Sequence, residues 1–277
     1  MKIRIRQMVI LLSQDAYLNK YSYFWNLFMC LLTFFCVGFF TKDGVGETFE
    51  STKCYCLSFG LCALLLAFIP AVGLWKSEHS FVKNEIENKE YTVWDYVSAK
   101  VILYMILTVL QGLIGAFLFV IFLDGHGANE SLICNFVFEI FGTMTLLSLA
   151  GASMGLLVSL VVKRRSFQLS LLIVAIIIMA QLVLSNSIFE LPDEFAAISY
   201  FIIMRWGIQA LCTSMDINNL PLKLRVIYPM IDQPVIEMFD FVKENIQQAW
   251  LSLLAFIVVF ILLFYFILKK DVEVIMR

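Results

Sequence analysis

Long apolar segments recur along the chain, and nearly all charged residues fall between them. Six uncharged segments reach roughly the 20 residues that a helix needs to cross a bilayer core of about 30 Å. Because backbone amides cannot stay unpaired in lipid, each segment is predicted to be a helix rather than a strand. The predicted spans are residues 21–41, 54–75, 101–123, 140–162, 166–189 and 249–268, the fourth beginning earlier, near Leu132.

The pattern therefore predicts an all-α integral membrane protein with six transmembrane helices in a membrane domain of residues 21–268. Residues 1–20 precede it, and apolar side chains there recur at helical spacing among basic ones, which predicts an amphipathic connecting helix on the inner membrane surface. The apolar positions of that helix are Ile5, Met8, Val9 and Leu12. Residues 269–277 form a short tail on the same side.

A long segment, residues 190–248, separates the fifth span from the sixth. Its first part, residues 195–212, is apolar, but it is too short to span and is interrupted by Arg205. We expect this part to form a re-entrant or interfacial helix pair. The remainder contains three prolines and is expected to fold as an extracellular cap.

The distribution of lysine and arginine predicts the orientation of the spans. Fourteen of the 20 basic residues fall on one side, in residues 1–20, the loops 76–100 and 163–165, and the tail 269–277. Four of the other six lie in the long segment before the last span, where such counts carry less weight. The positive-inside rule predicts a multi-pass cell-membrane protein with both termini in the cytoplasm.

Composition excludes several other classes of protein. Hydrophobic residues make up 61% of the chain and charged residues 15%, whereas soluble domains have roughly 45–50% and 25%. Soluble enzymes and disordered tails are excluded on this ground, and a net charge of −2 without long basic runs excludes nucleic-acid binding. The seven cysteines lack zinc-ligand spacing, so no metal site is expected. Disulfide bonds on the outer face, among Cys54, Cys134 and Cys212, are an alternative that the sequence does not exclude.

Residues 151–155 match the Gly-x-Ser-x-Gly pattern of serine nucleophiles, with Ser153 at the centre. A hydrolase also needs a base near the serine, and neither His79 nor His126 lies in a predicted span. The same residues read Gly-x-x-x-Gly, a face that lets two membrane helices approach closely, and we favour this packing role.

Two polar residues inside predicted spans are candidates for a functional site. Glu139 is the one carboxylate in a span, near its outer end, and it could handle a substrate or proton, reach the interface, or accept a hydrogen bond from Gln111 or Tyr104. Gln181 lies in the fifth span, where hydrogen bonding between helices and lining of a cavity are equally compatible with its amide.

The inner loop between the second and third spans is the most informative segment. No Gly-x-x-x-x-Gly-Lys-Ser/Thr motif is present, so energy for any transport must come from a partner or an ion gradient. The loop is rich in charge, and a short helix of about residues 77–90, with apolar Phe81 and Tyr91, would offer a contact for a soluble motor protein.

Two motifs resemble the membrane domain of ABCG (white/pleiotropic-drug-resistance) transporters. The pattern Glu78-x6-Glu85-x5-Tyr91-x4-Tyr96-x3-Lys100 resembles that family's Glu-rich coupling helix and the start of its third span. The pattern Tyr200-Phe201-x3-Arg205-Trp206-Gly207-x2-Ala210-Leu211 resembles its re-entrant segment. The order of elements also agrees over nearly the whole chain. Met204 replaces a common proline, and Ser185-Asn186 replaces a common Ser-Gly.

The resemblance implies the membrane-spanning permease subunit of a dimeric ABC exporter. The chain would be non-catalytic and bind no cofactor, while an ATP-binding cassette subunit or domain would bind ATP and magnesium. That partner would act on the coupling helix through Glu78, Phe81, Lys83, Glu85 and Tyr91. A second membrane subunit, identical or different, would complete a cavity lined by the second and fifth spans, with Leu66, Ile178 and Gln181 facing the substrate.

Two alternatives belong to other classes. The first is an ATPase-independent secondary transporter or sensor component, which would share the spans but need no motor contact. The second is an intramembrane enzyme acting through Ser153 or Glu139. Association with an ATP-binding chain separates the transporter subunit from both, and labelling of Ser153 by a fluorophosphonate would favour the enzyme.

Overall fold

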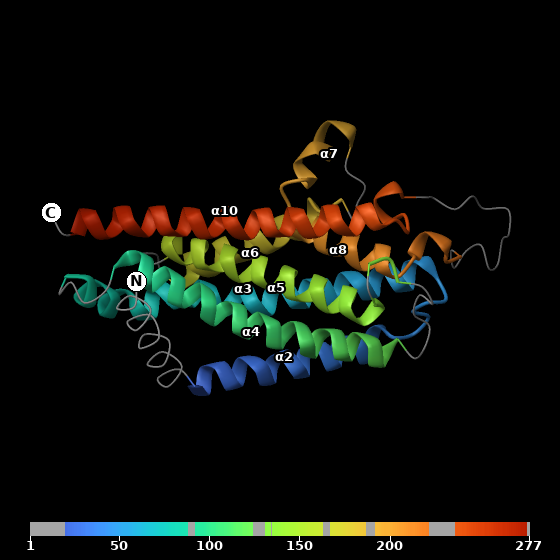
Figure 1. Cartoon of the computed structure of the whole chain (residues 1–277), viewed down its shortest axis with the longest axis horizontal. Coiled ribbons are helices and arrows are strands. Elements are labelled where there is room, and N and C mark those ends of the chain that lie inside the picture. Colours follow the sequence, from blue (N-terminus) through green and yellow to red (C-terminus); the bar gives the residue numbers. More distant parts are fainter. Residues whose placement is uncertain are drawn as a thin grey trace.

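The computed structural model describes residues 20–87, 92–123, 131–133, 135–162, 167–186, 192–221 and 236–275, and these residues are helical or in turns without strands. The predicted connecting helix lies outside the described residues except for Lys20. Six long helices run side by side along one axis (Figure 1). They are α2 (Lys20–Thr41), α3 (Phe49–Glu87), α4 (Val93–Phe122), α5 (Phe136–Val162), α6 (Phe167–Val183) and α10 (Lys243–Ile275).

Five of these helices, α2, α3, α4, α5 and α10, are long and apolar enough to cross a membrane. The predicted fifth span corresponds to α6, which is apolar but has only 17 residues. The helix ends early because the chain turns after Val183, and Asn186 takes a left-handed conformation with φ 57° that a helix cannot continue. The described chain is therefore multi-pass, with five candidate spans and one shorter apolar helix.

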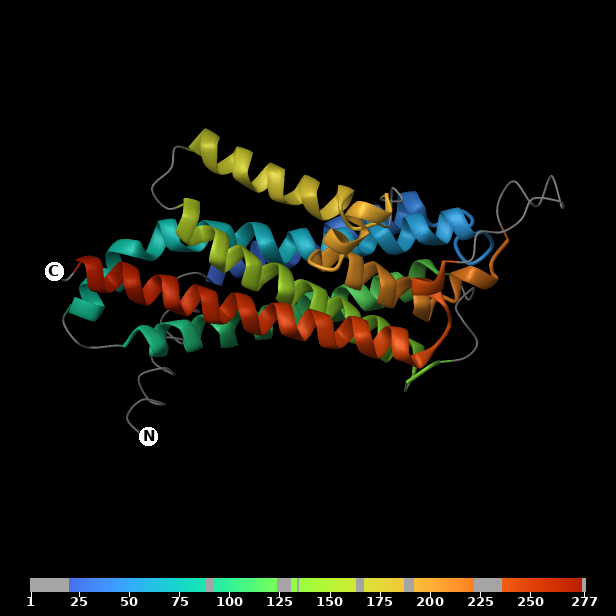
Figure 2. The same cartoon turned by 90° about the horizontal axis from the view of Figure 1, so that it is seen from above.

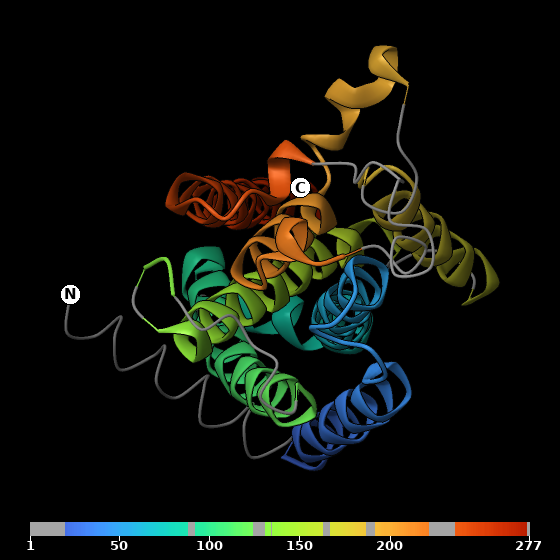
Figure 3. The same cartoon turned by 90° about the vertical axis from the view of Figure 1, so that its right-hand side faces the viewer.

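Helix α5 lies at the centre of the bundle and packs against α3, α4 and α10 (Figure 3). Of its most apolar window 72% is buried, compared with 17% for α2 at the edge. Small residues allow this packing: a Cβ added at Gly151 would lie 2.6 Å from the Leu64 carbonyl oxygen, and one at Gly155 equally close to that of Phe68. The prediction that this motif packs two helices together is confirmed for α5 against α3.

Helix α3 is longer than its predicted span. It continues without interruption to Glu87, so the backbone of residues 77–87 prolongs the second span, where a separate short helix was expected. The last turns of α3 bend away from the axis of the span (Figure 2). Pro70 lies inside the helix, and no later proline ends it before Glu87.

Between α6 and α10 the chain forms two short helices, α7 (Asp193–Ser199) and α8 (Ile203–Ser214). All residues of α8 are buried, and the helix packs against α10, α5 and α3. Helix α7 projects from the bundle (Figure 1). Two short 3-10 turns, η1 (Ile217–Asn219) and η2 (Glu237–Phe239), follow in the described parts of the segment. The expected pair of helices is present in this segment.

Candidate functional site

Gln181 joins α6 to the start of α8. Its side-chain oxygen accepts a hydrogen bond from the backbone N–H of Met204 at 3.1 Å, and its amide nitrogen lies 3.9 Å from the sulfur of Met154. Helix α8 has no capping side chain of its own at Ile202, so Gln181 satisfies one of its free N–H groups. Of the two roles open from the sequence, the structure shows hydrogen bonding between helices, and the side chain is 6% exposed.

Leu66 on α3 and Ile178 on α6 are both half-buried. Each packs against the large apolar core that α3, α5 and α8 share. Leu66 has a polar role that its side chain does not suggest, because its carbonyl oxygen accepts hydrogen bonds from Asn26 and Gln111. Asn26 was not among the residues expected to matter, since nothing in the sequence shows which spans are neighbours.

Glu139 binds the backbone of the segment that precedes α5. One carboxylate oxygen accepts hydrogen bonds from the backbone N–H groups of Leu132 at 2.8 Å and Ile133 at 2.6 Å. The residue is fully buried, and its second oxygen has no partner among the described residues. The donors to this carboxylate oxygen are therefore Leu132 and Ile133, whereas the sequence suggested Gln111 or Tyr104. Glu139 therefore stabilises the conformation of the residues that lead into its own helix.

Arg205, in the first turn of α8, lies close to the end of α7. Its guanidinium carbon is 4.0 Å from the ring centre of Tyr200 and 5.6 Å from that of Trp206, and Nη1 donates to the Ser199 hydroxyl. Trp206 donates from its indole nitrogen to the Tyr200 carbonyl at 3.0 Å. The predicted motif thus brings three of its residues together and fixes the turn between α7 and α8.

Gly207 has a different role in the same motif. A Cβ at this position would lie 2.7 Å from a methyl carbon of Leu147, so any larger residue there requires the Leu147 side chain to shift. Two predicted residues of the motif, Arg205 and Gly207, therefore act on opposite sides of α8, one toward α7 and one toward the core.

The residues expected to contact a motor protein lie on the prolonged end of α3. The backbone of Glu78, Phe81, Lys83 and Glu85 is helical, and their side chains and all of Tyr91 lie outside what the structure describes. Helix α4 begins directly afterwards with a capping box: Thr92 N–H donates to the Asp95 carboxylate at 3.1 Å, and Asp95 N–H donates to the Thr92 hydroxyl at 3.3 Å. This start of the third span is thereby fixed in position.

Ser153 is 2% exposed, and its hydroxyl donates to the Ala150 carbonyl within its own helix at 2.9 Å. The close approach of Gly151 and Gly155 to α3 makes the surroundings of Ser153 a packed interface between α3 and α5. The side chains of both histidines lie outside the described residues. Nothing in this arrangement of described residues activates the hydroxyl as a nucleophile.

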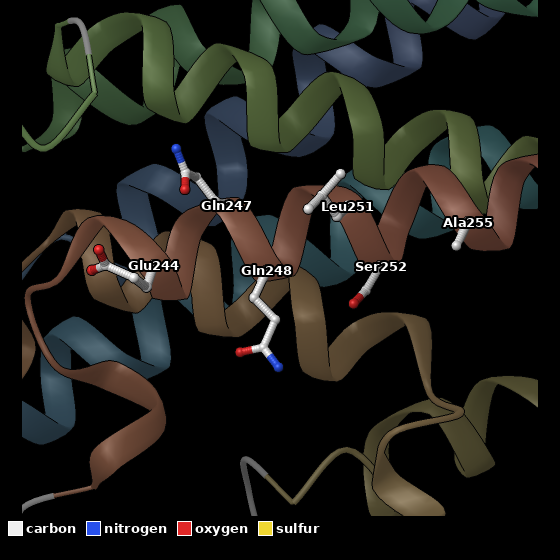
Figure 4. A pocket seen from close by; sticks show the side chains of 6 residues that line it. All are labelled: Glu244, Gln247, Gln248, Leu251, Ser252 and Ala255. Carbon is white, nitrogen blue, oxygen red and sulfur yellow. The ribbon is translucent and has the colours of Figure 1, made fainter.

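A shallow groove of about 460 Å³ follows the N-terminal end of α10 (Figure 4). Its lining residues recur every three or four positions along that helix, and Gln248 and Ser252 project from the same side of it. The lining consists of Glu244, Gln247, Gln248, Leu251, Ser252 and Ala255. The hydropathy pattern does not single out these lining residues. It divides them between the predicted loop that ends at residue 248 and the predicted span that begins at residue 249.

Six cysteines are free in the described part of the chain, Cys54 and Cys212 among them. A disulfide between these two is therefore absent, and Cys134 lies outside the described residues. Cys212 is buried in α8, where it behaves as the small apolar residue that the sequence suggests.

Comparison with known proteins identifies one family. The family model described as the membrane domain of ABC-2 type transporters matches residues 5–215. The match begins in the predicted connecting helix and ends just after α8, so it covers the first five apolar helices and the short helix pair. No curated protein matches the chain as a relative.

Proposed function

The chain belongs to the ABC-2 type transporter membrane domain family, and we propose that it is the permease subunit of a dimeric, ATP-driven ABC exporter. The family consists of membrane-embedded transport components that are generally non-catalytic. Membership implies association with an ABC ATPase and with the membrane. The observation that carries the proposal is the family match over residues 5–215, together with the apolar helices that it covers.

We further assign the chain to an ABCG-like subtype with six spans, α6 being the fifth. Asn186 supports this assignment, because it stands where the resemblance expects a glycine and has the positive φ, 57°, that glycine and asparagine tolerate best. The buried helix α8, with Arg205 and Gly207 in packing roles, suits a re-entrant segment between the fifth and sixth spans.

In this proposal the prolonged end of α3 receives motion from the partner ATPase. The partner binds ATP and magnesium, and this chain binds neither. Closure of the motor would move the backbone of Glu78, Phe81, Lys83 and Glu85, with Tyr91 beyond it, toward the dimer axis. A bistable interface of this kind responds to ATP only if the two states differ in affinity for it.

The substrate pathway would lie between α3 and α6 of two subunits, identical or different. Helix α6 packs mainly against α8 and α5 and stands apart from α2 and α4, so much of its apolar surface is open to a second subunit (Figure 3). Leu66 and Ile178 are half-buried and would line the pathway. Gln181 would act indirectly, by holding α8 beside it.

Co-purification tests the proposal. The chain, expressed with its candidate ATP-binding partner and purified through a tag on this chain alone, should retain the partner and hydrolyse ATP. Reversal of charge in Glu78→Lys and Glu85→Lys should weaken the association or uncouple hydrolysis from transport. Glu244→Lys, on the exposed outer end of α10, is the matched control and should change neither. Full coupling in both inner variants would refute the contact.

A further inference from the structure

Pro70 interrupts the hydrogen-bond ladder of α3 within its candidate span. A proline has no backbone N–H, so the carbonyl four residues earlier, that of Leu66, loses its helical partner. A carbonyl left unpaired inside lipid is strongly unfavourable, and neighbouring helices commonly supply a donor to it. The structure shows which groups do so here.

Two side-chain amides from different spans meet at the Leu66 carbonyl oxygen. Asn26 on α2 places Nδ2 at 3.5 Å and Gln111 on α4 places Nε2 at 3.4 Å, both long hydrogen bonds. The two amides are also joined to each other, because Gln111 Nε2 donates to Asn26 Oδ1 at 2.6 Å. We call these two side chains and the Leu66 carbonyl the amide cluster.

The orientation of the amide cluster is set by the need for donors. Gln111 is 3% exposed, and its Oε1 has no partner among the described residues. The amide is thus turned so that its nitrogen, not its oxygen, faces Asn26 and Leu66. Asn26 in turn accepts at Oδ1, which leaves its nitrogen to serve the carbonyl. Three spans are thus tied together at the point where Pro70 interrupts the hydrogen-bond ladder of α3.

We propose that Asn26 and Gln111 are positioning residues that set the angle of α3 at Pro70. Residues 71–87 follow Pro70 and include the segment to which we assign the motor contact, so the inference rests on the proposed function for its transport consequence. The amide cluster bridges α3 to α2 and α4 on the N-terminal side of Pro70. Loss of the cluster frees the inner part of α3 to take a range of angles.

The first experiment measures this angle without any partner. Spin labels on unnatural amino acids at Glu87, the last residue of α3, and at the exposed Lys270 of α10 report the distance between the inner ends of the two helices in nanodiscs. Gln111→Leu and Asn26→Leu should each broaden or shift the distance distribution. The control Thr108→Val removes a buried hydroxyl one turn away that donates to its own helix, and should leave the distribution unchanged.

Pro70→Ala provides an internal test, because alanine restores the N–H that pairs with the Leu66 carbonyl. In that background Gln111→Leu should have no further effect on the distance distribution, and it should no longer lower protein yield if it does so alone. An unchanged distribution for Gln111→Leu in the otherwise wild-type protein would overturn the inference. So would a shift of equal size in the wild-type and the Pro70→Ala backgrounds.

The second experiment measures coupling in proteoliposomes that contain the partner ATPase. Gln111→Leu should lower transport per ATP hydrolysed at least threefold while the ATPase remains bound, and adding Pro70→Ala should not lower it further. A shifted distance with unchanged coupling would overturn the positioning role. If the wild-type chain binds no ATPase, the proposed function fails instead, and the distance measurement still decides whether the amide cluster sets the angle of α3 at Pro70.

Discussion

Buried polar side chains in this bundle serve backbone groups that the helices cannot satisfy themselves. Glu139 accepts from two N–H groups before α5, Gln181 accepts from the first turn of α8, and Gln111 donates to the Leu66 carbonyl of α3. The sequence marked Glu139 and Gln181 as unusual because they are polar within apolar segments. The sequence could not assign their hydrogen-bond partners. It also could not pair Leu66 with Gln111, because these residues are 45 positions apart and become neighbours only when the spans pack together.

Gly155→Val tests the close approach of α5 to α3. The new side chain would meet the Phe68 carbonyl at 2.6 Å and the Ala71 methyl at 2.8 Å, so the helices must separate. We expect a loss of about 1–3 kcal/mol in stability, seen as a lower thermal midpoint in detergent. Gly73→Val on α3 is the control, because a Cβ there meets nothing within 4 Å. Equal losses in the two variants would contradict the packing role.

Glu139 offers a second test at this scale. Glu139→Leu removes the acceptor of two backbone N–H groups and should cost about 1–3 kcal/mol, while Glu139→Gln keeps one acceptor oxygen and should cost less. Thermal unfolding of the two variants beside wild type gives the comparison. A Glu139→Gln protein of wild-type stability that transports nothing would show that the charge itself matters, contrary to a purely structural role.

At the scale of elements, helix existence followed from hydropathy, and helix length did not. Helix α3 continues beyond its predicted span through Glu87, because many polar residues favour a helix as much as apolar ones do. The fifth apolar segment gives only 17 helical residues, because Asn186 ends it. Hydropathy records where lipid can contact the chain; backbone hydrogen bonding decides where a helix ends.

Gln181→Leu tests the link between α6 and α8. Removal of the acceptor leaves the Met204 N–H without a partner, so its amide should exchange with deuterium faster and α6 should pack less firmly. A stability loss of about 1 kcal/mol is typical for an interhelical hydrogen bond in a membrane protein. Gln168→Leu, at the exposed start of the same helix, is the control and should leave exchange at Met204 unchanged. Unaltered hydrogen exchange at Met204 in Gln181→Leu would contradict the proposed link between α6 and α8.

At the scale of the whole molecule, apolar composition and helix length predict a multi-pass membrane protein, and the family match agrees. Orientation is different in kind, because a bundle of helices has the same internal contacts whichever way it faces. It depends on where basic residues lie relative to a charged membrane surface, which the counts of lysine and arginine address directly. The prediction of cytoplasmic termini therefore needs a measurement on intact cells.

Cysteine accessibility supplies that measurement. Asp43→Cys lies in the exposed turn between α2 and α3, and Lys270→Cys lies at the exposed far end of α10. In a background with Cys36→Ser, Cys54→Ser and Cys134→Ser, the two exposed thiols of the described residues and the cysteine expected in the outer turn are removed. A membrane-impermeant maleimide should then label the cysteine at position 43 from outside and the one at position 270 only after the cells are opened. Fourteen of 20 basic residues then face the cytoplasm, on the side where an ATPase can reach α3. Labelling at position 270 in sealed cells would reverse the orientation and, with it, place the proposed motor contact beyond the reach of any cytoplasmic partner.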